Sequence, residues 1–214
     1  TPINDAPQAQ SQEHSILLPE DQTALVDLEG LVYDVDGDVL TYQFYDTENE
    51  AWLDIPQANH GLLDIKDHHL SYEPLLNFNG QDQLTFRTTD GQYYSSNLTL
   101  IFDVEAVNDP PVATAQTVQL VEGDSTPLIL SGQDAENIES ELTFTLRSLP
   151  TKGLLKLNQQ VIELVPLPVP AVGLSYQPNQ DFTDDLGGLD GFTFDVYDGQ
   201  LYSSSGEITL FIAV

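Results

Sequence analysis

Acidic residues stand at matching positions in the two halves of the chain, and they offer the clearest chemistry in the sequence. Carboxylates within a few ångströms of one another raise one another's pKa and oppose folding unless a cation shares them. Oxygen ligands at Asp-x-Asp spacing suit Ca²⁺, which accepts a large and variable coordination shell, whereas Zn²⁺ favours His or Cys. The matched positions are Glu20 with Glu122, Asp34 and Asp36 with Asp134 and Glu136, Asp82 with Asp190, and Asp90 with Asp198.

Whole phrases of the sequence return along with these acids. Asn4-Asp5-Ala6-Pro7 returns as Asn108-Asp109-Pro110-Pro111, and Leu70-Ser71-Tyr72 returns as Leu174-Ser175-Tyr176. A repeat of about half the chain corresponds to complete domains and not to small solenoid units. We therefore predict two domains, residues 1–106 and 107–214, joined by a short segment that the paired prolines stiffen.

The elements that must position these acids are β-strands. Apolar and polar residues alternate in 40–44, 98–104 and 208–214, and Asp-Gly and Asn-Gly turns separate such stretches. About seven short strands per domain predict an all-β fold of two tandem immunoglobulin-like β-sandwiches. The chain has no cysteine, so both sandwiches must be held without disulfides. The proline-alternating stretch 165–170 can form only a loop or an edge strand.

The charge of the chain excludes some partners. Five Lys and Arg residues face 35 Asp and Glu residues, which gives a formal net charge of −30 at pH 7. Such a surface repels nucleic-acid phosphates and anionic lipids. No apolar run approaches the roughly 20 residues of a membrane span, so we expect neither nucleic-acid binding nor direct membrane insertion.

The order of these acidic motifs resembles that of the cadherin repeat. The resemblance rests on an early Glu after a strand, an Asp-x-Asp or Asp-x-Glu, an Asp before a later strand, and Asn-Asp-Pro in the linker. The chain is most similar to the bacterial cadherin-like tandem repeats of large surface adhesins. Its phrases Lys152–Leu157, Leu174–Pro178 and Asp190–Phe194 also resemble the related repeats of chondroitin-sulfate-proteoglycan type. The likeness extends over nearly the whole chain and implies two cadherin-like sandwiches.

The resemblance also implies which residues hold calcium. One shared site at the junction would take Glu20 and Asp82 from the first domain, with Asn108, Asp109, Asp134, Glu136 and Asp198 from the linker and the second domain. Half of a further site, facing a preceding domain, would consist of Asn4, Asp5, Asp34, Asp36 and Asp90. Pro110 stands where the family usually has a second Asn, so we expect one ion per junction. The alternative is that these acids are solvated loop residues.

The function that the resemblance implies is mechanical. We expect calcium-rigidified extender repeats of a secreted bacterial surface adhesin, at the cell surface, in cell adhesion or biofilm formation, with neighbouring repeats as partners. The alternative is a module that binds a glycan or a host-surface protein. Trp52, Tyr93 and Tyr94 could form a glycan-stacking patch or could be cross-strand packing. We expect no enzyme, since acids present in both copies indicate a repeated structural role and no cleft is evident.

Overall fold

A computed structural model describes residues 3–179 and 188–213 and divides the chain into two compact units. The units are Thr1–Val107 and Asn108–Val214, so the division lies one residue from the expected boundary. Both units consist of β-strands, and the described residues include only one short 3₁₀ segment, η1 (Glu139–Glu141), in the second unit. The predicted all-β fold is confirmed. No helix of the described residues is long and apolar enough to cross a membrane.

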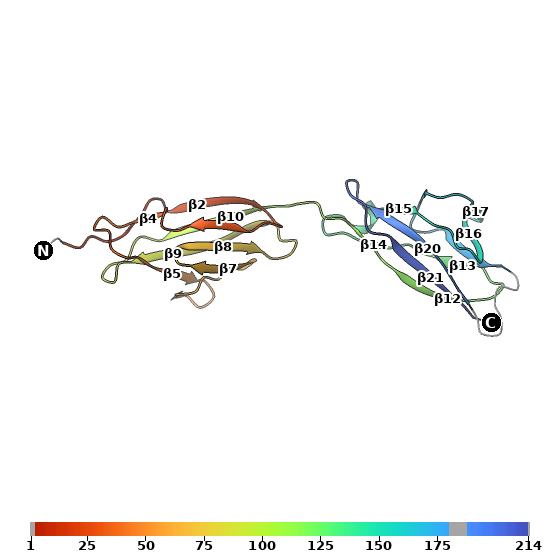
Figure 1. The fold of residues 1–214 in the computed structure, drawn as a ribbon, viewed down its shortest axis with the longest axis horizontal. Helices are drawn as coiled ribbons and strands as arrows, with labels where there is room; N and C mark the ends of the chain where they lie inside the picture. Colours follow the sequence, from red (N-terminus) through yellow and green to blue (C-terminus); the bar gives the residue numbers. More distant parts are fainter. Residues whose placement is uncertain (1–2, 180–187, 214) are drawn as a thin grey trace. The chain divides into compact units, whose positions relative to one another are not determined.

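The first unit packs a five-stranded sheet against a three-stranded sheet (Figure 1). The five-stranded sheet has the order β2-β10-β9-β5-β6, the three-stranded sheet has the order β3-β8-β7, and β1 pairs with β4. Strand β2 runs parallel to β10, and the other neighbours are antiparallel. The strands are β1 (Gln8–Ala9), β2 (Glu13–Pro19), β3 (Ala24–Asp27), β4 (Val32–Tyr33), β5 (Thr41–Asp46), β6 (Ala51–Leu53), β7 (Gly61–Lys66), β8 (His69–Pro74), β9 (Gly80–Thr89) and β10 (Leu98–Glu105).

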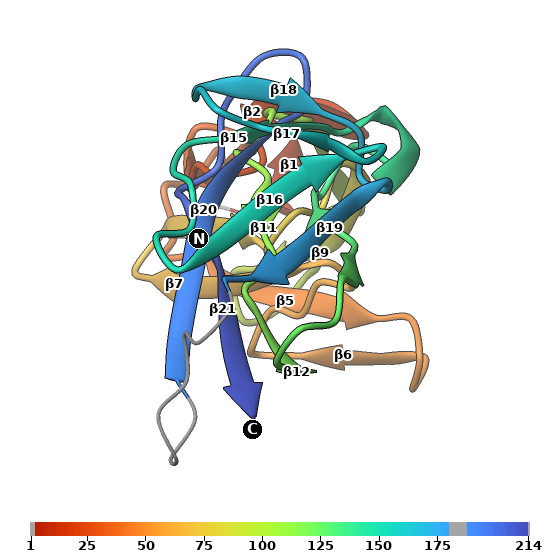
Figure 2. The same cartoon turned by 90° about the vertical axis from the view of Figure 1, so that its right-hand side faces the viewer.

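The second unit repeats this plan with two differences. Strand β18 takes the edge position that β6 has in the first unit, and β17 adds a fourth strand to the smaller sheet. The sheets of this unit have the orders β12-β21-β20-β15-β18 and β13-β19-β16-β17, and β11 pairs with β14. Figure 2 shows β16 and β19 side by side in this unit. The strands are β11 (Val112–Ala113), β12 (Gln116–Val121), β13 (Thr126–Leu128), β14 (Gly132–Gln133), β15 (Thr143–Leu146), β16 (Gly153–Leu157), β17 (Gln160–Val161), β18 (Leu167–Val169), β19 (Leu174–Pro178), β20 (Gly188–Tyr197) and β21 (Gly206–Ala213).

The alternation seen in the sequence places one side of each central strand in the core. In β10, Leu98, Leu100, Phe102 and Val104 are buried, and the residues between them are not. The proline-alternating stretch contributes β18, which lies at the edge of its sheet as the prolines require. Each core is built from packed apolar side chains without a disulfide, because the chain has no cysteine.

Candidate metal centre

Five of the predicted ligands lie together in the loops at the start of the first unit. The Asn4 side-chain amide donates to Asp90 Oδ2 at 2.8 Å. The Asp5 N–H donates to Asp36 Oδ2 at 2.8 Å, and the Asp36 N–H donates to Asp34 Oδ1 at 2.9 Å. These contacts join the entering chain to two separate loops, so the residues predicted as a half-site form one cluster, here called the first acidic cluster.

The second unit has the same cluster, with the same contacts. The Asn108 amide donates to Asp198 Oδ2 at 2.8 Å. The Asp109 N–H donates to Glu136 Oε2 at 3.1 Å, and the Glu136 N–H donates to Asp134 Oδ1 at 3.0 Å. These five residues form the second acidic cluster. Because the contacts match one for one with those of the first unit, the recurrence of these acids in the sequence reflects a recurring arrangement in space.

The aspartates of both clusters each use one oxygen to hold a turn. Asp34 Oδ1 accepts from the N–H groups of Asp36 and Asp38, and Asp90 Oδ1 accepts from those of Gln92 and Tyr93. Asp and Asn favour such turns because their short side chains reach the backbone two or three residues ahead. In the second unit, Asp134 and Asp198 hold the corresponding turns.

The second oxygen of one aspartate in each cluster has no hydrogen-bond partner. Asp34 Oδ2 and Asp134 Oδ2 are buried and accept no hydrogen bond from residues 3–179 or 188–213. A buried carboxylate oxygen without a donor is costly, and such oxygens are rare in folded proteins. Asp34, Asp36 and Asp38 also offer oxygens that all lie within 4.8 Å of one another. Crowded anionic oxygens of this kind, on residues that include the aspartate with the unsatisfied oxygen, are an arrangement that a hard cation would stabilise.

Local hydrogen bonds keep one aspartate of each cluster anionic. The N–H groups of Tyr93 and Gln92 lower the pKa of Asp90. Burial raises the pKa of Asp198, but hydrogen bonds from Leu201, Asn108 and Gln200 outweigh it, and the net pKa lies below the ordinary value. Both carboxylates are therefore ionised at neutral pH, in the form that binds a metal ion.

Glu20 lies at the other end of the first unit, where the chain leaves it. Its side chain is 4% exposed, and Oε1 accepts a 2.7 Å hydrogen bond from the Val107 N–H. The Glu20 N–H in turn donates to the Glu105 carbonyl at 3.0 Å. Glu20 Oε2 is buried without a partner, so this carboxylate also has an unused ligand oxygen. That Glu20 shares one ion with the second acidic cluster stays a prediction.

Asp82 has a different environment, in which hydrogen-bond donors surround both of its oxygens. Oδ2 accepts from the His60 N–H at 2.8 Å and the Tyr72 hydroxyl at 3.1 Å, and Oδ1 accepts from the Gln83 N–H at 2.9 Å. Gly61 leaves room for this contact, because a Cβ at that position would overlap the Tyr72 ring. Asp82 thus fastens the start of β7 to β8 and β9, and we leave it out of the ligand set.

Asp190 makes the same network in the second unit. It accepts from the N–H groups of Thr151 and Lys152, both at 2.9 Å, and from the Tyr176 hydroxyl at 2.7 Å. Tyr72 and Tyr176 belong to the Leu-Ser-Tyr phrases that recur in the sequence. The joint recurrence of this Tyr with the later Asp was the available signal that the pair forms a structural contact.

Asp190→Asn should lower the free energy of unfolding of the second unit by about 1–3 kcal/mol. The Asn amide would place its NH₂ group where Asp190 has an acceptor oxygen, and the donor at that oxygen would lose its partner. Burial raises the pKa of Asp190, but hydrogen bonds from Thr151, Tyr176 and Lys152 lower it by more. The net pKa lies below the ordinary value. The stabilisation is therefore full above the unfolded-state pKa of about 3.9 and is lost as pH falls through the folded-state pKa.

Urea unfolding at pH 7 and at pH 3 would measure this effect, with the exposed Asp124→Asn as the control in the same unit. The stability difference between Asp190→Asn and the unaltered protein should shrink at the lower pH. An equal loss at both pH values would show that the carboxylate charge is not what the donors recognise.

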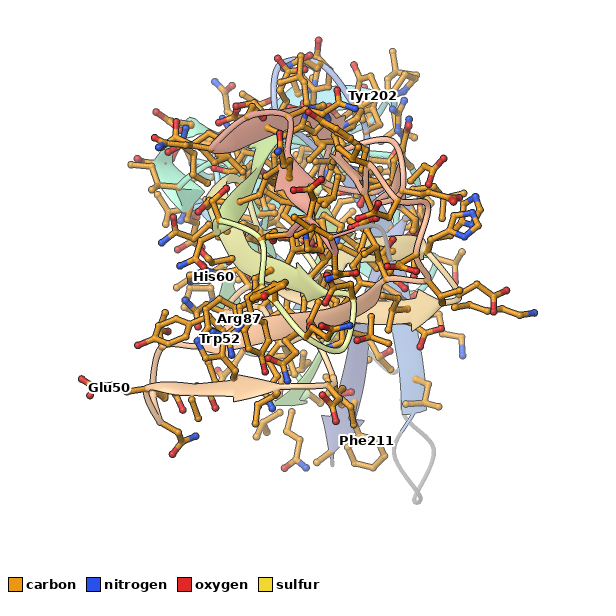
Figure 3. The ribbon with its side chains drawn as sticks, turned by 90° about the vertical axis from the view of Figure 1, so that its left-hand side faces the viewer. Glu50, Trp52, His60, Arg87, Tyr202 and Phe211 are labelled. Atoms are coloured by element: carbon orange, nitrogen blue, oxygen red, sulfur yellow. The ribbon has the colours of Figure 1, made fainter. Side chains whose placement is uncertain are left out.

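The aromatic residues considered as a glycan patch pack across strands. The Arg87 guanidinium lies 4.1 Å from the Trp52 ring centre and 3.9 Å from that of Tyr94 (Figure 3 labels Trp52 and Arg87). Tyr45, opposite Trp52 in the β5–β6 pair, adds a ring contact at 5.2 Å. Trp52 and Tyr94 thus form a cross-strand cluster around a cation. Tyr93 is half exposed beside it.

Comparison with known proteins identifies the family. The family model described as "Bacterial Ig domain" matches residues 4–103 and again residues 108–211. The chain belongs to the bacterial Ig domain family. Integrin beta-like protein C of Dictyostelium discoideum is 26% identical to this bacterial Ig chain over 98% of its length, and the match spans 12% of that relative.

Solved structures of cadherin ectodomains share the fold. PcdhgB3 EC1-4 is 15% identical, with a TM-score of 0.53, over 98% of this chain and 50% of that chain. Human CDH23 EC21-23 is 14% identical, with a TM-score of 0.50, over 98% of this chain and 70% of that chain. The predicted resemblance to cadherin-like tandem repeats is therefore confirmed at the level of the fold.

Proposed function

We propose that this pair of bacterial Ig domains is a calcium-binding extender segment of a secreted surface adhesin, acting in cell adhesion or biofilm formation. The observation that carries the proposal is the acidic cluster found in both units, each with a buried and unpartnered aspartate oxygen. The role is mechanical and not catalytic, since the repeated acids hold turns and linker residues.

The proposed stiffening acts on the segment that connects the units. Val107 is held to the first unit by Glu20, and Asn108 and Asp109 are held to the second unit by Asp198 and Glu136. An ion bound by the second acidic cluster would fix the linker backbone on its own unit. Freezing the backbone dihedrals of a residue costs about 1–2 kcal/mol. Weak hydrogen bonds alone therefore leave the linker backbone some motion, and a bound ion would reduce that motion.

The proposed site fits an extracellular setting. Calcium sites of extracellular modules bind at about 10⁻⁴–10⁻³ M, and millimolar calcium would keep such sites largely occupied. An ion that binds the folded unit alone stabilises it by mass action, by about 1.4 kcal/mol when its concentration is about ten times the dissociation constant.

Calcium should raise the melting temperature of both units by about 5–10 °C at roughly 10 mM, as expected for domains of this size. Differential scanning calorimetry of the intact chain in Ca²⁺ and in EDTA would measure the change. Mg²⁺ and NaCl at matched ionic strength are the controls, because a net charge of −30 is screened by any salt. Melting temperatures that are the same in Ca²⁺ as in those controls would rule out a specific site.

Asp134→Asn should abolish the calcium-dependent rise in the second unit and preserve it in the first unit. The amide keeps the turn acceptor but removes the charge and one ligand oxygen. Asp34→Asn should have the reverse effect, so each variant serves as the control for the other. Isothermal titration calorimetry should show about one bound ion fewer for each variant. Unchanged stoichiometry in both variants would contradict the assignment.

A further inference from the structure

The central strand β5 of the first unit has an edge that is only partly covered. Strand β9 pairs with β5 over Thr41–Phe44, but β6 joins the opposite edge only from Phe44 onward. Among the described residues, the stretch from Thr41 to Gln43 has no strand partner on that side. In the second unit, the corresponding strand β15 is covered there by β18, which places Val169 opposite Phe144.

The backbone groups of Tyr42 point toward this open edge. Tyr42 stands opposite Thr88 in the antiparallel ladder. Thr88 donates its N–H to Ser95 Oγ at 3.0 Å and accepts the Ser95 N–H at 2.9 Å, so both of its backbone groups face away from β5. Opposite residues in such a ladder exchange either both hydrogen bonds or neither, so the N–H and C=O of Tyr42 face outward. An exposed pair of this kind is a template for an added strand.

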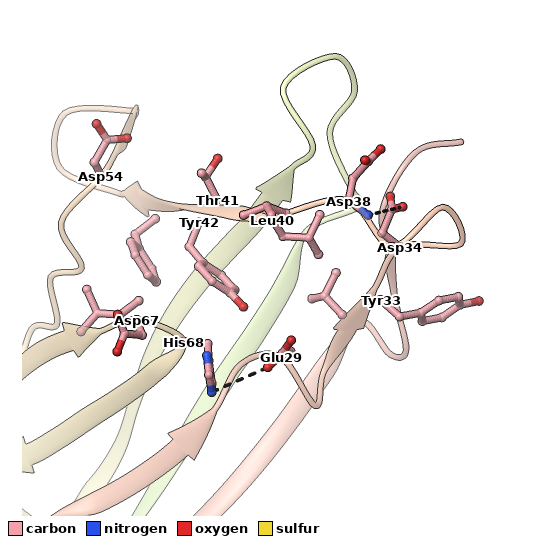
Figure 4. Close-up of a pocket in the computed structure, with 15 residues that line it drawn as sticks. Glu29, Tyr33, Asp34, Asp38, Leu40, Thr41, Tyr42, Asp54, Asp67 and His68 are labelled. Atoms are coloured by element: carbon pink, nitrogen blue, oxygen red, sulfur yellow. Dashed lines mark hydrogen bonds and ion pairs between the residues drawn. The ribbon is translucent and has the colours of Figure 1, made fainter. Parts of the chain in front are cut away.

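A groove of about 750 Å³ runs along this edge (Figure 4). Tyr42 of β5 and Leu40, just before that strand, line it, as do Val32, Phe44 and Ile65. Burial and the charges of Glu29 and Asp27 raise the pKa of Tyr42 to about 12, so its hydroxyl stays protonated. The groove therefore combines apolar side chains with a hydrogen-bond donor.

The groove is also strongly acidic. Among the described residues no Lys or Arg lines it, and His68 is the one lining residue able to become cationic. The His68 imidazole lies 3.7 Å from the Glu29 carboxylate. The lining carboxylates are Glu29, Asp34, Asp38, Asp54 and Asp67. A ligand that fills this space must supply apolar surface and positive charge together.

The second unit shows what kind of segment fits at this edge. Its chain between β17 and β19 forms β18, in which Val169 is buried in the core and Leu167 packs against it, while Pro168 between them is exposed. The first unit has no such segment, because β7 and β8 are joined by the turn at Asp67 and His68 alone. An occupant of the open edge would thus alternate apolar residues with residues that face outward.

We propose that the groove of the first unit binds an extended segment of a partner protein, which adds as a strand beside Tyr42 and alternates apolar with basic residues. The apolar side chains contact the groove lining, and the Lys or Arg side chains reach the carboxylates at its rim. A second copy of this chain is a poor occupant, because two chains of charge −30 repel each other.

The test uses a capped seven-residue peptide of alternating lysine and valine, titrated into the intact chain in EDTA and followed by ¹H–¹⁵N NMR. Binding should be saturable and should slow hydrogen exchange of the Tyr42 amide. A peptide of alternating lysine and serine has the same charge and controls for general attraction to an acidic protein. Equal affinity for both peptides, with no protection of Tyr42, would overturn the proposal.

Two double variants test whether Asp54 and Asp67, at the rim of the groove, bind the basic side chains of the peptide. Asp54→Asn with Asp67→Asn should weaken binding of the lysine–valine peptide about threefold to tenfold, as expected for two exposed ion pairs. Glu13→Gln with Asp64→Asn removes the same charge from exposed positions outside the groove and should leave the affinity nearly unchanged. Equal weakening of peptide binding by both double variants would contradict the assignment. It would also be contradicted if sedimentation showed dimers of the chain and dimerisation protected the Tyr42 amide from exchange.

Discussion

The hydrogen bond from a backbone N–H to a side-chain carboxylate oxygen is the interaction on which both units depend. It closes the turns at Asp34 and Asp90 and their counterparts, and it attaches the entering chain through Asp36 or Glu136. A carboxylate has two oxygens, and the use of one for the turn leaves the other to be satisfied in another way. At Asp82 and Asp190, by contrast, a tyrosine hydroxyl and backbone N–H groups fill both oxygens. At Asp34 and Asp134 no group in the described part of the chain fills the second oxygen.

This difference separates two kinds of repeated acid that look alike in a sequence. Both are aspartates in loops or at strand starts, and both recur in the two copies. Where donors fill both oxygens, as at Asp82 and Asp190, the acid is part of the fold, and its recurrence records a required contact. Asp90 and Asp198 also have donors on both oxygens, so they hold the entering chain, and their part in binding an ion stays a prediction. Where an oxygen is left over, the acid is available to an ion. The same consideration gives Glu20 a place among the candidate ligands although it lies at the opposite end of its unit from the first acidic cluster.

The sequence allowed much of the fold to be predicted, because alternation and turn residues act locally. The stretch 98–104 became β10, and the proline-alternating stretch 165–170 contains an edge strand. Contacts between distant residues were harder to predict. The residues next to Asp82 in the sequence do not indicate that His60 and Tyr72 donate to it, since that depends on how β7, β8 and β9 pack; the one signal was the joint recurrence of the Tyr and the Asp in both copies. The open edge beside Tyr42 was missed for a similar reason: it results from the short turn between β7 and β8, and its meaning emerges only when the two units are compared.

The parallel pairing of β2 with β10, and of β12 with β21, has a mechanical consequence for a chain that is pulled. The chain enters each unit along one of these strands and leaves along the other, and parallel strands place the entry and exit at opposite ends of the ladder. Tension between the ends therefore acts along the strands and strains their hydrogen bonds in shear, so that the bonds must yield together and not one after another. In β2 and β10 this ladder extends from Glu13 and Thr99 to Pro19 and Glu105, the full length of β2. Such a geometry resists stretching through topology, before any ion is bound.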